Sequence, residues 1–110
     1  MSERLLTDFE LMLLLAVLRV GEDAYGVTIA RELEETGGRT TTLAAIYLAL
    51  ERMREGGLVR SRLGQKTPRR GGRAKKMWSV TGAGLRAIKR TRNAFVALWK
   101  GIPELKGARA

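Results

Sequence analysis

The sequence contains no cysteine and no histidine. Without cysteine the chain has no disulfide framework and no thiolate nucleophile, and without histidine it has no imidazole general base. The absence of both residue types also excludes every common zinc site. Only carboxylates, lysine, tyrosine, serine and threonine remain for chemistry, and their arrangement shows no catalytic constellation. We therefore expect a protein that is not an enzyme and that needs no metal or other cofactor.

Long uncharged hydrophobic runs are also missing. The most apolar stretch, residues 1–18, carries the charged residues Glu3, Arg4, Asp8 and Glu10, which are incompatible with a signal peptide or a membrane span. The 110 residues, of which 45% are hydrophobic, suffice for one folded domain. We expect a cytoplasmic protein with no stable membrane association.

Acidic residues are absent between residues 58 and 80, where 8 lysines and arginines lie. The formal charge is −4 over residues 1–57, +8 over residues 58–80 and +6 over residues 81–110, which gives the net charge of +10. A merely solvated basic face is one explanation, but such faces usually mix both signs. The segregation of charge therefore favours a polyanionic partner, with nucleic acid before membrane.

A first helix is expected to begin after Thr7 or Asp8, either of which can cap it, and to end at Gly21. Its residues are apolar on nearly every side, and a helix of this kind is normally buried all round. One small domain has few elements with which to cover it. We therefore expect a partner chain to pack against one side of this helix.

Two more helices are predicted before the basic segment. Apolar residues at helical spacing predict one over about residues 24–35 and another from an N-cap at Thr42 to the Gly56-Gly57 pair. Between them, residues 39–41, which include the β-branched Thr40 and Thr41, predict a short strand. The outer face of the later helix has small residues at its amino-terminal end, which favours close approach to the floor of a DNA groove.

The basic segment is predicted to form a β-hairpin from strands over residues 58–63 and 74–80, joined by a loop too long for a tight turn. Met77 and Trp78 are expected to point to opposite faces of the second strand, one into the core and the other half exposed. This order of elements indicates a fold that is mainly α-helical with a small β-hairpin. We interpret it as a winged helix-turn-helix domain in which the hairpin is the wing.

Thr81 is predicted to cap a last helix over about residues 82–100, whose apolar residues recur at a period close to 3.5. Such a stripe is typical of a helix that pairs with another copy. We expect a DNA-binding domain over residues 1–80, a dimerisation helix over residues 81–102 and a flexible tail over residues 103–110. The expected dimer interface comprises Leu11, Leu14, Leu85, Ile88, Phe95, Leu98, Trp99 and Ile102.

Several short motifs follow one another along residues 5–90. They are Tyr25-Gly26, Leu43-Ala44-Ala45-Ile46-Tyr47, Leu50-Glu51-Arg52-Met53, Gly57-Leu58-Val59, Arg70-Gly71-Gly72-Arg73-Ala74-Lys75-Lys76 and Thr81-Gly82-Ala83-Gly84. In this order and at these separations the chain resembles the PadR-type transcriptional regulators, short winged-helix proteins that dimerise through a carboxy-terminal helix. The last helix is similar to that of the subfamily with a single such helix.

The resemblance implies that Tyr47 contacts the DNA backbone and that the cations of the Arg70–Lys76 motif lie on or beside the wing. We expect a dimeric transcriptional regulator, a repressor, that binds an inverted-repeat operator in double-stranded DNA. Sequence preference is expected to come from the exposed side of the third helix. The expected DNA-binding residues are Thr41, Thr42, Ala44, Ala45, Tyr47, Arg52, Lys66, Arg69, Arg70, Arg73, Lys75 and Lys76.

Two alternatives concern the last helix. Its cations beside Phe95 and Trp99 are also typical of an amphipathic helix that associates with anionic membrane surfaces. In addition, these two rings either fill the dimer interface or bind an aromatic small-molecule effector between the protomers. The residue pattern leaves both questions open.

Overall fold

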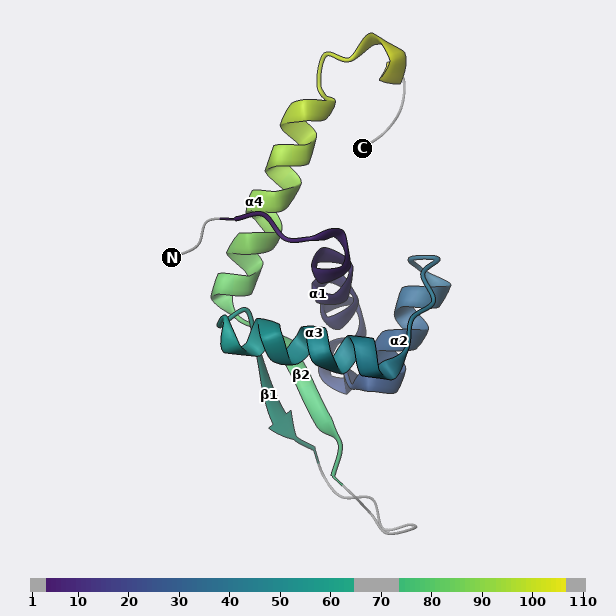
Figure 1. The fold of residues 1–110 in the computed structure, drawn as a ribbon, viewed down its shortest axis with the longest axis vertical. Coiled ribbons are helices and arrows are strands. Elements are labelled where there is room, and N and C mark those ends of the chain that lie inside the picture. Colours follow the sequence, from purple (N-terminus) through teal and green to yellow (C-terminus); the bar gives the residue numbers. More distant parts are fainter. Residues whose placement is uncertain (1–3, 65–73, 107–110) are drawn as a thin grey trace.

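A computed structural model of the chain describes residues 4–64 and 74–106. The described residues form helices and one hairpin, as predicted (Figure 1). In chain order the elements are α1 (Asp8–Val20), the 3-10 turn η1 (Gly21–Asp23), α2 (Gly26–Glu35), α3 (Leu43–Glu55), β1 (Val59–Leu63), β2 (Lys76–Val80), α4 (Gly82–Trp99) and the 3-10 turn η2 (Pro103–Leu105). The hairpin and the far end of α4 extend in opposite directions from the bundle formed by α1, α2 and α3.

Threonine side chains cap three of the helices. The Thr7 hydroxyl accepts from the backbone N–H of Glu10 at 3.1 Å, and the Glu10 carboxylate accepts from the backbone N–H of Thr7 at 2.8 Å. This reciprocal pair is a capping box, and it decides between the two predicted caps in favour of Thr7. The predicted caps Thr42 and Thr81 are confirmed, since each hydroxyl accepts from a backbone N–H three residues ahead.

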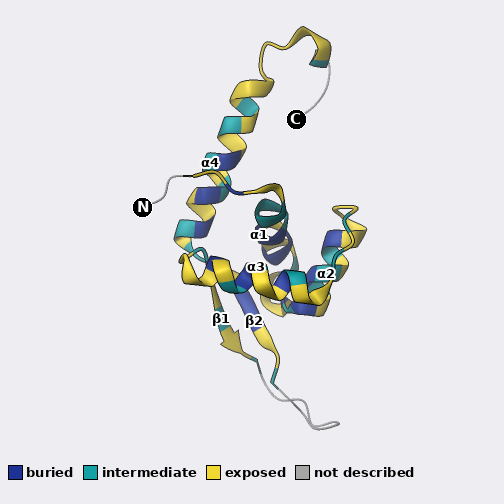
Figure 2. Cartoon of the chain, viewed as in Figure 1, coloured by how far each residue is buried: buried dark blue, intermediate teal, exposed yellow. Residues whose placement is uncertain are grey.

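Helix α1 is the centre of the core, because it contacts α2, α3, α4 and β2. Its Leu13 and Leu14 side chains are completely buried, while Leu15 and Leu18 remain exposed. Figure 2 shows buried residues along α1. The placement of Leu14 in a dimer interface is therefore wrong: the chain's own elements cover that side chain, and no surface is left for a partner. The apolar character of α1 is explained largely within one chain.

The sheet of the described residues consists of β1 and β2 alone, paired antiparallel with Val59 opposite Val80. The strand predicted at residues 39–41 is wrong, because those residues adopt no regular structure. The outer edge of β2 has another partner: the Trp78 N–H donates to the carbonyl of Ala24 at 2.9 Å. The segment before α2 thus supplies a backbone partner at this edge of the hairpin.

Met77 and Trp78 are both buried, at 8% and 3% exposure. The expectation that one of them is half exposed is wrong. Trp78 belongs to the main core, as predicted for one of the two, whereas Met77 lies outside that cluster. On its side of the hairpin Gly64 approaches so closely that a methyl group there would lie 3.2 Å from the Met77 side chain.

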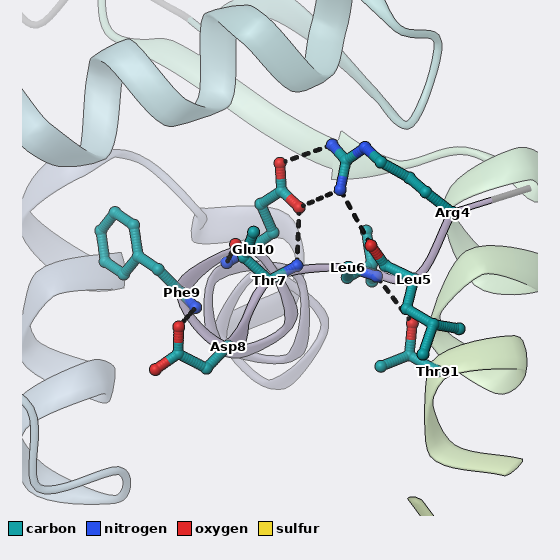
Figure 3. A network of polar contacts seen from close by, with 8 residues as sticks. All are labelled: Arg4, Leu5, Leu6, Thr7, Asp8, Phe9, Glu10 and Thr91. Carbon is teal, nitrogen blue, oxygen red and sulfur yellow. Dashed lines mark hydrogen bonds and ion pairs between the residues drawn. The ribbon is translucent and has the colours of Figure 1, made fainter. Parts of the chain in front are cut away.

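Helix α4 is held to α1 by the segment that precedes α1 (Figure 3). The side chain of Leu6 is buried, and its backbone N–H donates to the Thr91 hydroxyl at 3.0 Å. In the same network Arg4 donates to both carboxylate oxygens of Glu10, and this hydrogen bonding lowers the pKa of Glu10 from its ordinary value. The middle of α4 therefore has a defined position, while its last turns and η2 extend beyond the core.

Candidate nucleic-acid interface

Helix α3 and the hairpin lie next to each other, and α3 also contacts α2 (Figure 1). Of the residues predicted to face a DNA groove, Thr42, Ala44 and Arg52 are exposed. Thr41 and Ala45 are half-buried. The start of α3 therefore presents small side chains, whereas its end carries an exposed cation.

Tyr47 is 39% exposed, and its ring lies against the start of α2. A methyl group on Gly26 would lie 2.2 Å from the Tyr47 hydroxyl oxygen, which is closer than any real contact. Glycine at this position is therefore what allows α3 to approach α2. The hydroxyl group of Tyr47 lies where the backbone N–H groups of α2 begin, and such groups favour anions.

The two described lysines at the start of β2 are both directed at the protein body. The Lys75 ammonium lies 4.2 Å from the centre of the Tyr25 ring, a cation–π contact. The Lys76 ammonium donates to the Glu51 carboxylate of α3 at 2.8 Å. This hydrogen bond, together with one from Arg54, lowers the pKa of Glu51. The basic run around Lys76 suggests a free cation, and nothing in the neighbouring sequence points to Glu51 as its partner.

The structure brings a further pair of cations to the hairpin. Arg60 and Arg62 are exposed and alternate along β1, so they share one face of the strand. They were counted in the basic segment but were not among the predicted site residues. Four predicted wing residues lie outside the described residues, namely Lys66, Arg69, Arg70 and Arg73.

The apolar stripe of α4 is largely uncovered. Phe95 is 60% exposed and Leu98 is 76% exposed. Leu85, Trp99 and Ile102 are also exposed, whereas Ile88 packs against the core. Between α1 and α4 lies a groove of about 410 Å³, lined by Leu11, Leu15, Ile88, Arg92, Phe95, Val96 and Trp99. The helix thus presents a hydrophobic face that one chain does not bury.

Within residues 4–64 and 74–106, no group of acidic side chains is arranged to hold a metal ion. No helix in the same part of the chain combines the length and the apolar character needed to cross a membrane.

Three helices followed by a two-stranded hairpin, with α3 exposed beside that hairpin, define the class of winged helix-turn-helix proteins. The sequence model of the "Transcriptional regulator PadR-like family" matches residues 14–90. The chain belongs to this family, whose members are transcriptional regulators and not enzymes. No curated protein matches the chain.

Solved structures of low sequence identity share the fold. A PadR family transcription regulator from Clostridium difficile R20291 is 24% identical, with 90% of this chain and 99% of that chain covered and a TM-score of 0.65. For a PadR-like regulator from Bacillus cereus ATCC 14579 the identity is 20%, the coverage 92% and 93%, and the TM-score 0.70. The chain is also similar to Bacillus subtilis PadR in complex with operator DNA, at 22% identity, 76% and 46% coverage and a TM-score of 0.62.

Proposed function

We propose that the protein is a homodimeric repressor, acting in the cytoplasm, that binds an inverted-repeat operator through α3 and the basic hairpin. The observation that carries the proposal is the presence of two different surfaces on the same chain. One is the exposed face of α3 beside the cationic hairpin, and the other is the uncovered apolar face of α4. A dimer formed through α4 sets two α3 helices about one DNA turn, roughly 34 Å, apart. The operator-bound structure of Bacillus subtilis PadR supports the DNA-binding part of the proposal.

Selection of bound fragments from random DNA tests this function directly. We expect enrichment of an inverted repeat whose half-site centres are about 10 base pairs apart. If no fragment is preferred over random DNA, the protein is not a sequence-specific regulator. Co-sedimentation with anionic liposomes in dilute salt would test the membrane alternative, which predicts pelleting.

Loss of wing charge is expected to weaken binding to all sequences alike. If each wing neutralises about three to five phosphates, the slope of log K against log salt is about −5 to −9 for the dimer. The double substitution Arg70→Ala with Arg73→Ala should flatten this slope by about two per protomer. Titrations of one labelled duplex at several salt concentrations measure it. Arg31→Ala, which removes an exposed cation of α2, is the control and should leave the slope unchanged. Equal slopes for the unaltered protein, the double variant and the control would mean that the loop does not contact DNA.

We further propose an aromatic small-molecule effector for the groove between α1 and α4. The lining is almost entirely apolar, and it includes the rings of Phe95 and Trp99. Flat apolar surfaces of this kind suit a planar ligand. The competing interpretation is that both rings only fill the space between protomers.

Tryptophan fluorescence distinguishes these two uses of the rings. A planar aromatic ligand is expected to quench the emission of Trp99, while Trp78, buried in the core, serves as an internal reference. The variant Trp99→Phe should lose the response and keep the Trp78 signal. An unchanged spectrum across a panel of planar aromatic compounds, with the protein still dimeric, would reject the effector site.

A further inference from the structure

Glu51 is one of two acidic residues on α3, and both of its carboxylate oxygens are occupied. One accepts from the Arg54 side chain at 2.7 Å and the other from the Lys76 ammonium at 2.8 Å. Hydrogen bonding by Lys76 and then by Arg54 holds the pKa of this carboxyl below its ordinary value. The group is therefore an anion at neutral pH, placed between the exposed helix and the hairpin.

The ion pair between Lys76 and Glu51 connects the hairpin to α3. Lys76 is the first residue of β2 and lies opposite Leu63, the last residue of β1, at the end of the paired strands that is farthest from α4. Its bond to Glu51 joins residues 25 positions apart in the chain. The pair thus links the distal part of the hairpin to α3, and it directs one cation of the hairpin inward.

The ion pair is also weak enough for Lys76 to exchange the Glu51 carboxylate for another anion. The Lys76 and Glu51 side chains remain 45% and 35% exposed, and an exposed ion pair contributes little to folding because solvent screens it. A DNA phosphate is a second anion that a lysine at this surface can reach. Because phosphate contacts supply nearly all non-specific affinity, a carboxylate that competes for Lys76 lowers binding to every sequence.

We propose that Glu51 is a specificity-determining residue: it retains Lys76 and Arg54 beside α3 and withholds them from DNA phosphates. The inference rests on the proposed DNA-binding surface. With the carboxylate present, the affinity for non-specific DNA stays low, and the hairpin keeps its position beside α3. Without it, two cations per protomer become available to any duplex, and discrimination between sequences falls.

The test compares Glu51→Gln with Glu55→Gln. Both substitutions remove one negative charge from α3, but the exposed Glu55 makes no ion pair with another described residue. On a random-sequence duplex, Glu51→Gln is expected to steepen the salt slope by about one per protomer for each cation that gains a phosphate. With one such cation per protomer, the affinity lost between about 50 and 200 mM salt should rise by about tenfold for the dimer. Glu55→Gln should leave the slope unchanged.

A second experiment tests whether the change in salt slope caused by Glu51→Gln depends on Lys76. In the background of Lys76→Gln, adding Glu51→Gln should change the slope by no more than half as much as it does alone, since only Arg54 is then left to be released. On a duplex selected by the unaltered protein, the ratio of selected to random affinity should fall for Glu51→Gln only. Equal slopes for Glu51→Gln and Glu55→Gln would overturn the inference and leave the proposed function standing. Failure of the unaltered protein to prefer any duplex would overturn the proposed function, while the slope on random DNA would still decide the role of Glu51.

Discussion

Gly84→Ala is expected to lower the free energy of unfolding by more than about 2 kcal/mol, which is the upper range for overpacking a core. A Cβ atom at this position would lie 2.2 Å from the carbonyl oxygen of Leu58 and 2.6 Å from a methyl group of Val80. The Leu58 backbone has little freedom to move, because its carbonyl accepts from the Thr81 N–H at 3.0 Å and its own N–H donates to Met53 at 2.9 Å. The clash would therefore separate the start of α4 from the base of the hairpin.

Denaturant unfolding followed by circular dichroism measures this effect, with Gly82→Ala as the control. Gly82 lies in the same first turn of α4, yet a methyl group there would meet only the tip of Arg86 at 3.5 Å. Alanine is the better helix former by up to about 1 kcal/mol, so this control should be neutral or stabilising. A similar loss of stability in both variants would show that the first turn of α4 is sensitive to any substitution, and that the contact with Leu58 is not the cause. Because the wing strand β2 leads directly into α4, Gly84→Ala should also weaken DNA binding.

The features that could be predicted from the sequence are those that depend on neighbouring residues. The caps Thr42 and Thr81 each bond a residue three positions ahead, and the apolar spacing within α3 reports its buried side directly. The hairpin followed from a run of strand-forming residues on both sides of a basic loop. The cap bonds span three residues, and the two strands of the hairpin are consecutive segments of the chain.

The errors arose where the partner is remote. The strand expected at residues 39–41 does not form, and the Trp78 N–H of β2 donates to the Ala24 carbonyl, which belongs to a segment more than fifty residues earlier. Leu14 has the same character as its neighbour Leu15, and only the packing of four elements around α1 decides which is buried. Local pattern alone does not contain that information.

The candidate site shows the same division. The positions of Thr42 and Tyr47 follow from the helix period, but the partner of Lys76 does not. Lys76 meets Glu51 across the gap between a strand and a helix, so its sequence neighbours suggest only an uncompensated cation. Charge counting therefore overestimated the number of free cations on the hairpin.

Phe95→Glu is expected to abolish the proposed dimer at micromolar concentrations. Phe95 is 60% exposed in the single chain, so the substitution should leave the fold of each protomer intact. In a dimer formed through α4, however, it would bury two unpaired carboxylates, and removal of a central aromatic residue alone often costs 2 kcal/mol or more. We expect the dimer dissociation constant to rise by at least about 100-fold. Sedimentation velocity over a range of concentrations measures this change.

Ala97→Glu is the matched control, because it adds the same charge two residues away on α4. At about 100° per residue, position 97 lies on the opposite side of the helix from Phe95, and Ala97 is exposed. This variant should remain dimeric. Loss of the dimer should also weaken binding to a selected operator by about 10²–10⁴-fold, since the second half-site then no longer benefits from the first. A Phe95→Glu protein that stays dimeric would mean that copies pair through another surface, and the spacing of the two α3 helices would then have to be set by that surface instead.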